Sequence, residues 1–406
     1  MVDTKQAALS ETKTYQDISR SLGNLALRGP VSLNSGSAAP DFLPINVVHS
    51  PLITPEPLPP PARIGMALDA VDTPALLLDL DLFERNLAAL PQSLEGSGVQ
   101  IRPHAKAHKC PEIALRQIAH GAVGVCCQKV SEAEALALGG VRDILISNEV
   151  VGAAKLDRLA ALAQRARIAV CVDHAANVAA LNEAAGRHGV VVDALVEINV
   201  GANRCGVEPG EPTLELQHLR TPELRAEAID AAVAKVRKSV ALLTSYGLPV
   251  ERVTGAGTGT YRLEAASQIY NEVQPGSYIF MDADYGRNLG PGGAPLSDFA
   301  YSLFILTTVM SCPNPQRAVV DVGLKAHSVD SGMPLVHAVP GATYVRAADE
   351  HGVLELAESA RLELGQKVRL IPGHCDPTVN LYDWMVGFRA ERVEAIWRIA
   401  GRGAFY

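Results

Sequence analysis

From Asp72 to about residue 297, short apolar runs alternate with segments of helical period. The runs that we interpret as strands lie at 74–80, 100–105, 122–127, 143–148, 168–173, 193–200, 251–257 and 276–282. A strand followed by a helix, repeated along a chain, builds a parallel sheet with its helices packed outside. About eight such units predict an α/β fold, a TIM-like parallel (β/α)8 barrel, and a doubly wound open sheet is the competing fold.

Two different regions flank this rhythm. Residues 1–70 form a Pro/Ser-rich N-terminal arm, whose composition favours extended chain. Beyond about residue 298 the helical segments become sparse, and runs such as YSLFILTTVM and QKVRLIP resemble strands joined by turns. We therefore expect the arm over 1–70, the barrel over 71–297 and a C-terminal, mostly antiparallel β domain over 298–406.

One barrel helix has recognisable ends in the sequence. Ser131 and Glu134 have the spacing of a capping box, in which two side chains satisfy backbone N–H groups at a helix start. Gly139 is a typical residue at a helix end. Together these residues predict a helix over 131–140.

Charge and composition exclude several classes of protein. The formal net charge is −8, which argues against nucleic acid or an anionic membrane as a partner. No apolar run has the length needed to cross a bilayer. Seven cysteines show no regular framework, so we expect free thiols in a reducing, cytoplasmic setting. A targeting role for the arm over 1–70 stays open.

The segment RPHAKAHKC at 102–110 concentrates cations around Lys106. In a strand, alternate side chains point to opposite faces, which would make one face apolar and the other cationic. Neighbouring cations lower the pKa of a lysine, and a neutral lysine attacks carbonyl carbons. We interpret Lys106 as a candidate nucleophile at a strand end, and a solvated basic edge is the alternative.

The segment TGAGTGTY at 254–261 combines three glycines with three threonines after a strand-like run. Glycine lets backbone N–H groups converge and threonine hydroxyls add donors, so the loop suits a phosphate group. The spacing matches neither a dinucleotide fingerprint nor a P-loop. A plain flexible turn is the alternative.

The segment PGHCDPTVN at 372–380 places His374 and Asp376 two positions apart. In an extended segment both side chains would face one cation. Imidazole and carboxylate together suit Mn²⁺, Zn²⁺ or Mg²⁺, and two protein ligands leave positions open for substrate. A simple turn is the alternative.

Two further features follow apolar runs. Arg204 comes just after EINVGA and could bond an anionic ring oxygen, while Ser277 and Tyr278 could complete a phosphate site. A nucleophilic lysine, a phosphate cradle and a barrel are together what a pyridoxal-phosphate enzyme needs.

The motifs quoted above, together with DVGLKAHSVDSGMP at 321–334 and QPGSYIFMDADYG at 274–286, resemble those of the D-threonine aldolase group of alanine-racemase-type, fold type III, pyridoxal-phosphate enzymes. The resemblance runs from about Asp72 to the C-terminus and does not include the arm. His327 departs from the apolar or small residue expected there, which leaves substrate preference open.

The resemblance implies a role for each matching residue. Lys106 matches the lysine that binds the cofactor covalently, and Arg204 matches the arginine near the cofactor ring. His374 and Asp376 match the metal ligands, with His374 also contributing to catalysis. The phosphate-binding region is matched by Gly257, Thr258, Gly259, Thr260, Ser277 and Tyr278.

The implied activity is metal-activated cleavage of D-threonine and other D-3-hydroxy-amino acids to glycine and an aldehyde, with Mn²⁺ as the expected metal and Mg²⁺, Co²⁺ or Zn²⁺ as alternatives. In the related D-serine dehydratases the metal motif resembles His-x-Cys, so Asp376 favours an aldolase. A D-serine or D-threo-3-hydroxyaspartate dehydratase remains the alternative, and a racemase or a non-enzymatic cofactor carrier is more distant. The resemblance also implies a homodimer.

Overall fold

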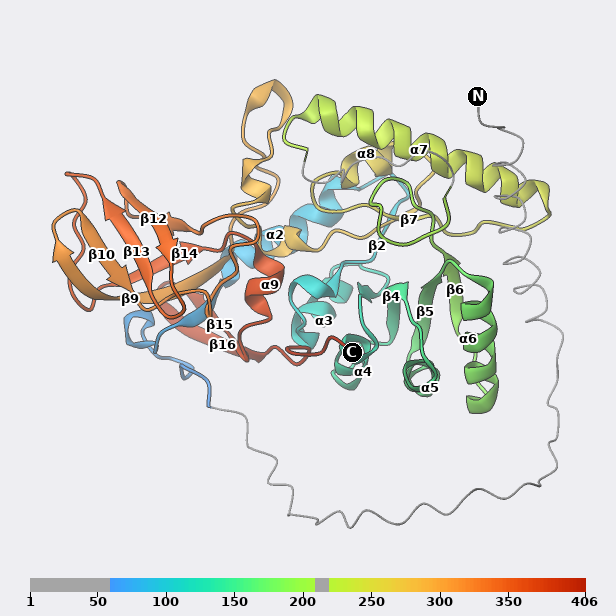
Figure 1. Ribbon diagram of the computed structural model, residues 1–406, viewed down its shortest axis with the longest axis horizontal. Helices are drawn as coiled ribbons and strands as arrows, with labels where there is room; N and C mark the ends of the chain where they lie inside the picture. Colours follow the sequence, from blue (N-terminus) through green and yellow to red (C-terminus); the bar gives the residue numbers. More distant parts are fainter. Residues whose placement is uncertain (1–58, 209–218) are drawn as a thin grey trace, which may run out of the picture.

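The computed structural model describes residues 59–208 and 219–406. Two bodies lie side by side along the long axis, a barrel of strands and helices and a β domain (Figure 1). The arm predicted over 1–70 falls mostly outside the described residues. Its last part packs against the β domain, where Gly65 N donates to Val393 O at 2.8 Å.

The barrel strands are short and parallel. One sheet has the order β3-β4-β5-β6 and another the order β2-β8-β7, and a bridge between His104 and Cys126 joins them. The strands are β2 (Gln100–Ile101), β3 (Val125–Cys127), β4 (Asp143–Glu149), β5 (Arg167–Val172), β6 (Asp193–Val196), β7 (Thr254–Gly255) and β8 (Glu272–Val273). The predicted α/β barrel class is confirmed by this arrangement and by the structural relatives described below.

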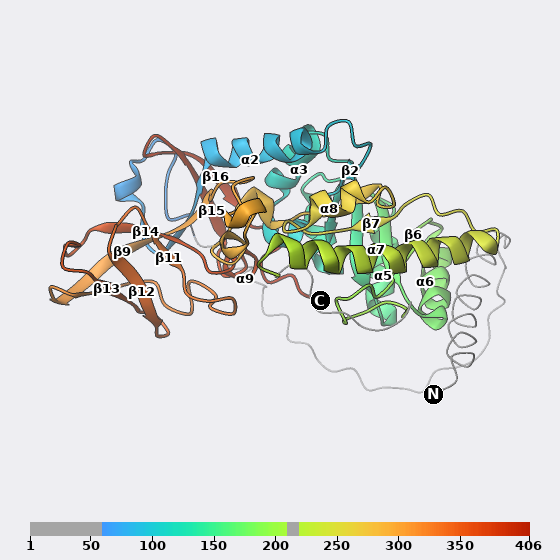
Figure 2. The same ribbon diagram turned by 90° about the horizontal axis from the view of Figure 1, so that it is seen from above.

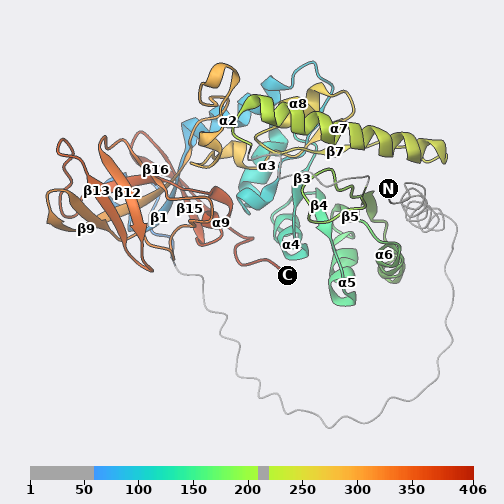
Figure 3. The same ribbon diagram turned by 45° about the horizontal axis from the view of Figure 1, so that its top comes forward.

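Helices pack outside these strands, and Figure 3 shows α4, α5 and α6 along the β3–β6 sheet. Their apolar faces meet the strands in one buried cluster that includes Leu136, Leu159 and Ile168. The helices are α2 (Leu80–Ser93), α3 (Pro111–Ala119), α4 (Val130–Leu138), α5 (Ala153–Leu162), α6 (Ala175–His188), α7 (Pro222–Ser245) and α8 (Tyr261–Ala266). Among the described residues, no helix has both the length and the apolar character to span a membrane.

The start of α4 differs from the predicted capping box. The residue that precedes the helix is Lys129 rather than Ser131, and the side chain that reaches back is that of Glu132. Its Oε2 accepts from the backbone N of Gln128 at 2.8 Å and of Lys129 at 3.1 Å. The predicted end is correct, because Gly139 is the C-terminal cap.

The first predicted strand forms, but in the other body. Strand β1 (Ala75–Asp79) pairs parallel with β15 and antiparallel with β9, so the expectation that 74–80 opens the barrel is wrong. Figure 3 shows β1 beside β15. Residues 75–78 are fully buried on both faces of the sheet. A strand covered on both faces has the same continuous apolar run as a barrel strand, so the run could not identify its sheet.

The last predicted barrel strand, 276–282, is also wrong. Strand β8 ends at Val273, and Ser277–Ile279 form a 3-10 helix, η4. Every residue from Ser277 to Ala283 is buried, so the run lacks the alternation that would distinguish a strand from a tight helical turn.

The C-terminal domain is the expected β structure. Its sheet has the order β12-β13-β10-β9-β1-β15-β16, with β14 and then β11 attached to β9, and every pair except β1–β15 is antiparallel. The strands are β9 (Leu303–Asn314), β10 (Arg317–Val320), β11 (Leu335–His337), β12 (Ala342–Ala347), β13 (Gly352–Leu356), β14 (Lys367–Ile371), β15 (Trp384–Arg389) and β16 (Arg392–Arg398). A short helix, α9 (Cys375–Val379), leaves this domain toward the barrel (Figures 1 and 2).

Candidate active site

Lys106 lies in a 3-10 turn, η2 (Ala105–Ala107), just after strand β2. The expected extended segment with one cationic face does not form, because the strand ends at Ile101. Arg102 is instead buried below the turn, with Nη1 2.5 Å from Asp143 Oδ1 and Nε 3.0 Å from Glu272 Oε2. The arginine therefore pairs with two carboxylates within the barrel. The prediction that it joins the cations around Lys106 is wrong.

The ammonium of Lys106 forms an ion pair with Asp376 of the β domain. This contact exists because α9 packs against η2. Burial lowers the pKa of Lys106, but the charge and hydrogen bond of Asp376 outweigh it and raise the pKa above its ordinary value. The expectation that neighbouring cations lower this pKa is wrong, since the counter-charge comes from a segment 270 residues away.

Asp376 shows the other half of this pairing. Burial opposes its ionisation, yet Lys106 and then His374 hold the pKa of its carboxyl below the usual range. Only 12% of the Asp376 side chain is exposed. The site therefore contains a protected carboxylate that faces the lysine.

His374 precedes helix α9, and Asp376 lies in the first turn of that helix. The extended geometry expected for the His-x-Asp motif is therefore wrong, although the two side chains are near enough for His374 to lower the pKa of Asp376. The imidazole is 26% exposed, and its Nδ1 lies 2.7 Å from Asp330 Oδ2. No group of three or more His, Cys, Asp or Glu side chains that could hold a metal ion occurs in the described ranges.

The glycine- and threonine-rich loop meets the segment of Ser277 and Tyr278. Thr258 Oγ1 accepts from the backbone N of Tyr278 at 3.0 Å. Ser277 Oγ lies 3.5 Å from Asp376 Oδ1, which connects this region to the lysine and the metal motif. The hydroxyl of Tyr278 instead accepts from Gln117 at 3.1 Å, and that of Thr260 donates to Glu264 at 2.8 Å.

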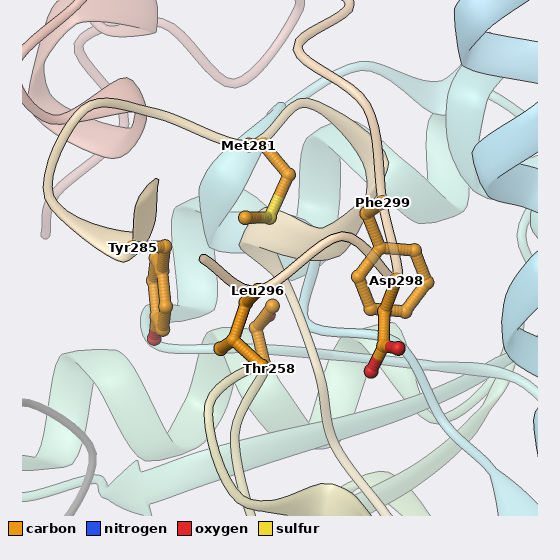
Figure 4. A pocket seen from close by; sticks show the side chains of 6 residues that line it. All are labelled: Thr258, Met281, Tyr285, Leu296, Asp298 and Phe299. Carbon is orange, nitrogen blue, oxygen red and sulfur yellow. The ribbon is translucent and has the colours of Figure 1, made fainter. Parts of the chain in front are cut away.

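A small pocket lies beside Thr258 (Figure 4). Lys106 is not among the residues that line it. Its walls are the side chains of Thr258, Met281, Tyr285, Leu296, Asp298 and Phe299.

Known protein families and individual proteins resemble this chain in sequence. The family described as "Alanine racemase, N-terminal domain" matches residues 78–284, and "Putative serine dehydratase domain" matches residues 302–388. A D-threonine aldolase of Arthrobacter sp is 47% identical over 369 residues, which cover 85% of this chain and 97% of that protein. The chain belongs to the D-threonine aldolase family.

Other relatives extend the comparison. A 3-hydroxy-D-aspartate aldolase of Paracoccus denitrificans (strain Pd 1222) is 45% identical, covering 85% of this chain and 96% of that protein. The crystal structure of D-threonine aldolase from Filomicrobium marinum matches with a TM-score of 0.82 and 46% identity, covering 85% of this chain and 100% of that one. A D-threo-3-hydroxyaspartate dehydratase of Delftia sp. (strain HT23) is only 27% identical, over 76% of this chain and 92% of that protein.

The resemblance seen in the motifs is therefore confirmed, and family membership makes the chain a pyridoxal-phosphate-dependent lyase of the aldolase type.

Arg204, expected near the cofactor ring, is exposed after strand β6. Burial, followed by the charge of Lys106, is the main cause that lowers the pKa of His104. The charge of Arg204 lowers this pKa further. Arg204 therefore lies near the lysine end of the barrel.

The motif search missed a pair of glutamates in the barrel. Glu149 ends β4, and Glu197 follows β6 with its backbone N bonded to Val172 O at 3.0 Å. Burial first, and then the charge of Glu149, raises the pKa of Glu197 to about 7. Their position at the carboxyl ends of strands is the pattern that could have indicated them.

The motif search also missed Asp330, the partner of His374, and the polar contacts of His104. His104 Nε2 lies 2.8 Å from Gln128 Nε2 and 3.2 Å from Ser147 Oγ. Gln128 follows β3 and Ser147 lies near the end of β4, at the same ends of the barrel strands as Glu149 and Glu197. Asp330 lies in a quoted motif, but nothing local indicates that it reaches His374.

Proposed function

We propose that this chain cleaves D-threonine and other D-3-hydroxy-amino acids to glycine and an aldehyde, with pyridoxal phosphate and a divalent cation. The observation that carries the proposal is the meeting of Lys106 with Asp376, beside His374. Two segments 270 residues apart bring the expected cofactor lysine and the expected metal ligands to one place.

The residues around Lys106 fit the cofactor. The Lys106 amine would hold its aldehyde carbon, and Arg204 would lie near its ring. The backbone approaches the site closely at Gly276, where an added Cβ would lie only 3.1 Å from His104 Cβ. The phosphate would be held by Gly257, Thr258, Gly259 and Thr260, with Ser277 and Tyr278. Pyridoxal phosphate supplies the electron sink that allows the Cα–Cβ bond of the substrate to break.

The donor set at α9 fits a divalent cation, with Mn²⁺ proposed and Mg²⁺, Co²⁺ or Zn²⁺ as alternatives. His374 Nδ1 is engaged by Asp330, which leaves Nε2 as the donor atom. With the Lys106 nitrogen holding the cofactor instead of carrying a free ammonium, the Asp376 carboxylate would be available as a second ligand. A cation bound by His374 and Asp376 would lower the pKa of a substrate hydroxyl.

The deciding experiment is the product formed by purified protein with pyridoxal phosphate, Mn²⁺ and D-threonine. The proposal predicts acetaldehyde and glycine. The alternative, a D-serine or D-threo-3-hydroxyaspartate dehydratase, predicts a 2-oxo acid and ammonia. Assays with D-threonine, D-serine and D-threo-3-hydroxyaspartate in parallel define the preferred substrate.

Three variants and treatments test the assigned roles. Lys106→Ala should abolish the visible absorbance of covalently held cofactor, and unchanged absorbance would remove Lys106 from that role. His374→Ala should reduce turnover while the cofactor stays bound. Turnover that persists in full after chelation and dialysis would contradict the metal requirement.

We also propose a homodimer in a reducing, cytoplasmic compartment. Exposed apolar side chains near the α9 end of the β domain, Leu324, Met333 and Leu335, suit a protein interface. All seven cysteines lie within the described residues and none forms a disulfide. Sedimentation velocity at micromolar concentration tests the dimer, and a monomer would contradict it.

A further inference from the structure

We propose that Asp330 is a positioning residue that fixes the ring of His374, so that Nε2 faces the cation site. The inference rests on the proposed function, because it assigns His374 to a metal. Asp330 belongs to the loop between β10 and β11.

The hydrogen bond between the two side chains determines where the imidazole proton lies. His374 Nδ1 is 2.7 Å from Asp330 Oδ2. An ionised carboxylate only accepts hydrogen bonds, so Nδ1 must be the donor and carry the proton. In the neutral ring the lone pair is then on Nε2, which is the arrangement that a metal-binding histidine needs.

Both oxygens of the Asp330 carboxylate are held within its own loop. Ser328 Oγ donates to Oδ1 at 2.6 Å, and Ser331 Oγ donates to Oδ2 at 3.3 Å. The loop is also bonded to α9, because Ser328 N donates to Thr378 Oγ1 at 3.2 Å and Thr378 Oγ1 donates to His374 O at 2.7 Å. The carboxylate and the imidazole are therefore fixed relative to each other.

The loop is also anchored on either side of Asp330. His327 is fully buried, and its Nε2 lies 3.0 Å from the hydroxyl of Tyr344 on β12, which donates to Val322 O at 2.8 Å. Arg287 donates to Ser331 O at 2.6 Å. His327 thus connects the loop to Tyr344 of β12, which gives this unexpected histidine a structural role.

Exposure separates this role from a contribution to folding. The Asp330 side chain is 51% exposed, and ion pairs with exposed carboxylates contribute little to stability. Removing Asp330 should therefore leave the thermal midpoint nearly unchanged while it frees the ring of His374. A weaker metal site in a fully folded protein is the expected result.

The test compares Asp330→Ala and Asp330→Asn with a matched control. The control is Glu350→Ala, which removes an exposed carboxylate paired with Lys325 in the same domain. Each protein is loaded with pyridoxal phosphate, stripped with a chelator, and titrated with Mn²⁺ while free Mn²⁺ is followed by electron paramagnetic resonance. Asp330→Ala should raise the Mn²⁺ dissociation constant about 10- to 100-fold. Asp330→Asn should raise it less, because the amide oxygen still accepts from Nδ1, and the control should stay within about twofold.

A second measurement does not depend on metal. The ring nitrogen shifts of ¹⁵N-labelled histidine, with His374 assigned through His374→Gln, report its tautomer in the stripped protein at pH 8.5. Nδ1–H is expected in the wild type, and a shift toward Nε2–H is expected in Asp330→Ala.

Two outcomes would overturn the inference: a ring of His374 protonated at Nε2 in the wild type, or an Asp330→Ala protein that binds Mn²⁺ as tightly as the wild type. If the wild type bound no Mn²⁺, the proposed metal site would fail instead. The tautomer of His374 would still decide the role of Asp330.

Discussion

Replacing Glu197 by glutamine should stabilise the protein at alkaline pH but not at acid pH. Glu197 faces Glu149, Cys171 and Arg204, and Cys205 in turn faces Glu149. Burial and the neighbouring carboxylate raise the pKa of Glu197 from 4.5 to about 7, although Cys171 and Arg204 oppose the shift. Glutamine keeps the shape of the protonated Glu197 side chain, and its amide can donate to Glu149. Position 197 therefore never adds a second negative charge beside Glu149.

The direction in which the free energy of unfolding changes with pH follows from proton binding. Between pH 4.5 and about 7 the folded protein keeps a proton that the unfolded chain has lost, so the free energy of unfolding falls as the pH rises through this window. A rise from 4.5 to about 7 corresponds to roughly 3 kcal/mol, since one pKa unit is worth about 1.4 kcal/mol. Solvent screening of a partly exposed side chain reduces this to about 2 kcal/mol.

The assay is the thermal midpoint followed by circular dichroism at pH 5 and at pH 8, for wild type and Glu197→Gln. The variant should match the wild type at pH 5 and exceed it by a few degrees at pH 8. Glu183→Gln, an exposed change on α6, is the control and should show no such dependence. A difference between Glu197→Gln and wild type that is the same at both pH values would refute the reasoning.

Other parts of the barrel and the β domain give further predictions. Glu272→Ala leaves buried Arg102 with one carboxylate fewer and should lower the free energy of unfolding by about 3 kcal/mol in urea titrations; a loss below about 1 kcal/mol would contradict this ion pair. In Gly139→Ala, the added Cβ would lie 2.2 Å from Pro111 Cβ, so a loss of about 1–3 kcal/mol is expected, and an unchanged urea midpoint would disprove the contact. His327→Leu should cost about 1–2 kcal/mol by removing its hydrogen bond to a buried tyrosine, while unaltered stability would show that the bond is unimportant.

Several elements could be predicted because burial leaves a local pattern. Strands β4 and β5 lie almost where the apolar runs of 143–148 and 168–173 place them, and the end of α4 follows from Gly139. These elements are correct because side-chain period and backbone conformation are properties of neighbouring residues. The strand-rich C-terminal domain was predictable for the same reason.

Other expectations failed where the decisive partner is distant. The run 74–80 specifies a buried strand, but only its pairing with β9 and β15 assigns it to the β domain. His374 and Asp376 lie in a helical turn rather than an extended segment. The sequence spacing was the same in both geometries, so it could not choose between them.

The sequence by itself determined the residue types that the chemistry needs: a lysine among cations, a loop of glycine and threonine, and an imidazole two positions from a carboxylate. Only the tertiary structure decided which charges meet, because Arg102 turns to Asp143 and Glu272 while Asp376 reaches Lys106. The physical reason is that electrostatic energy depends on distance and burial in space. Both are set by how the β domain packs against the barrel, which no local pattern records.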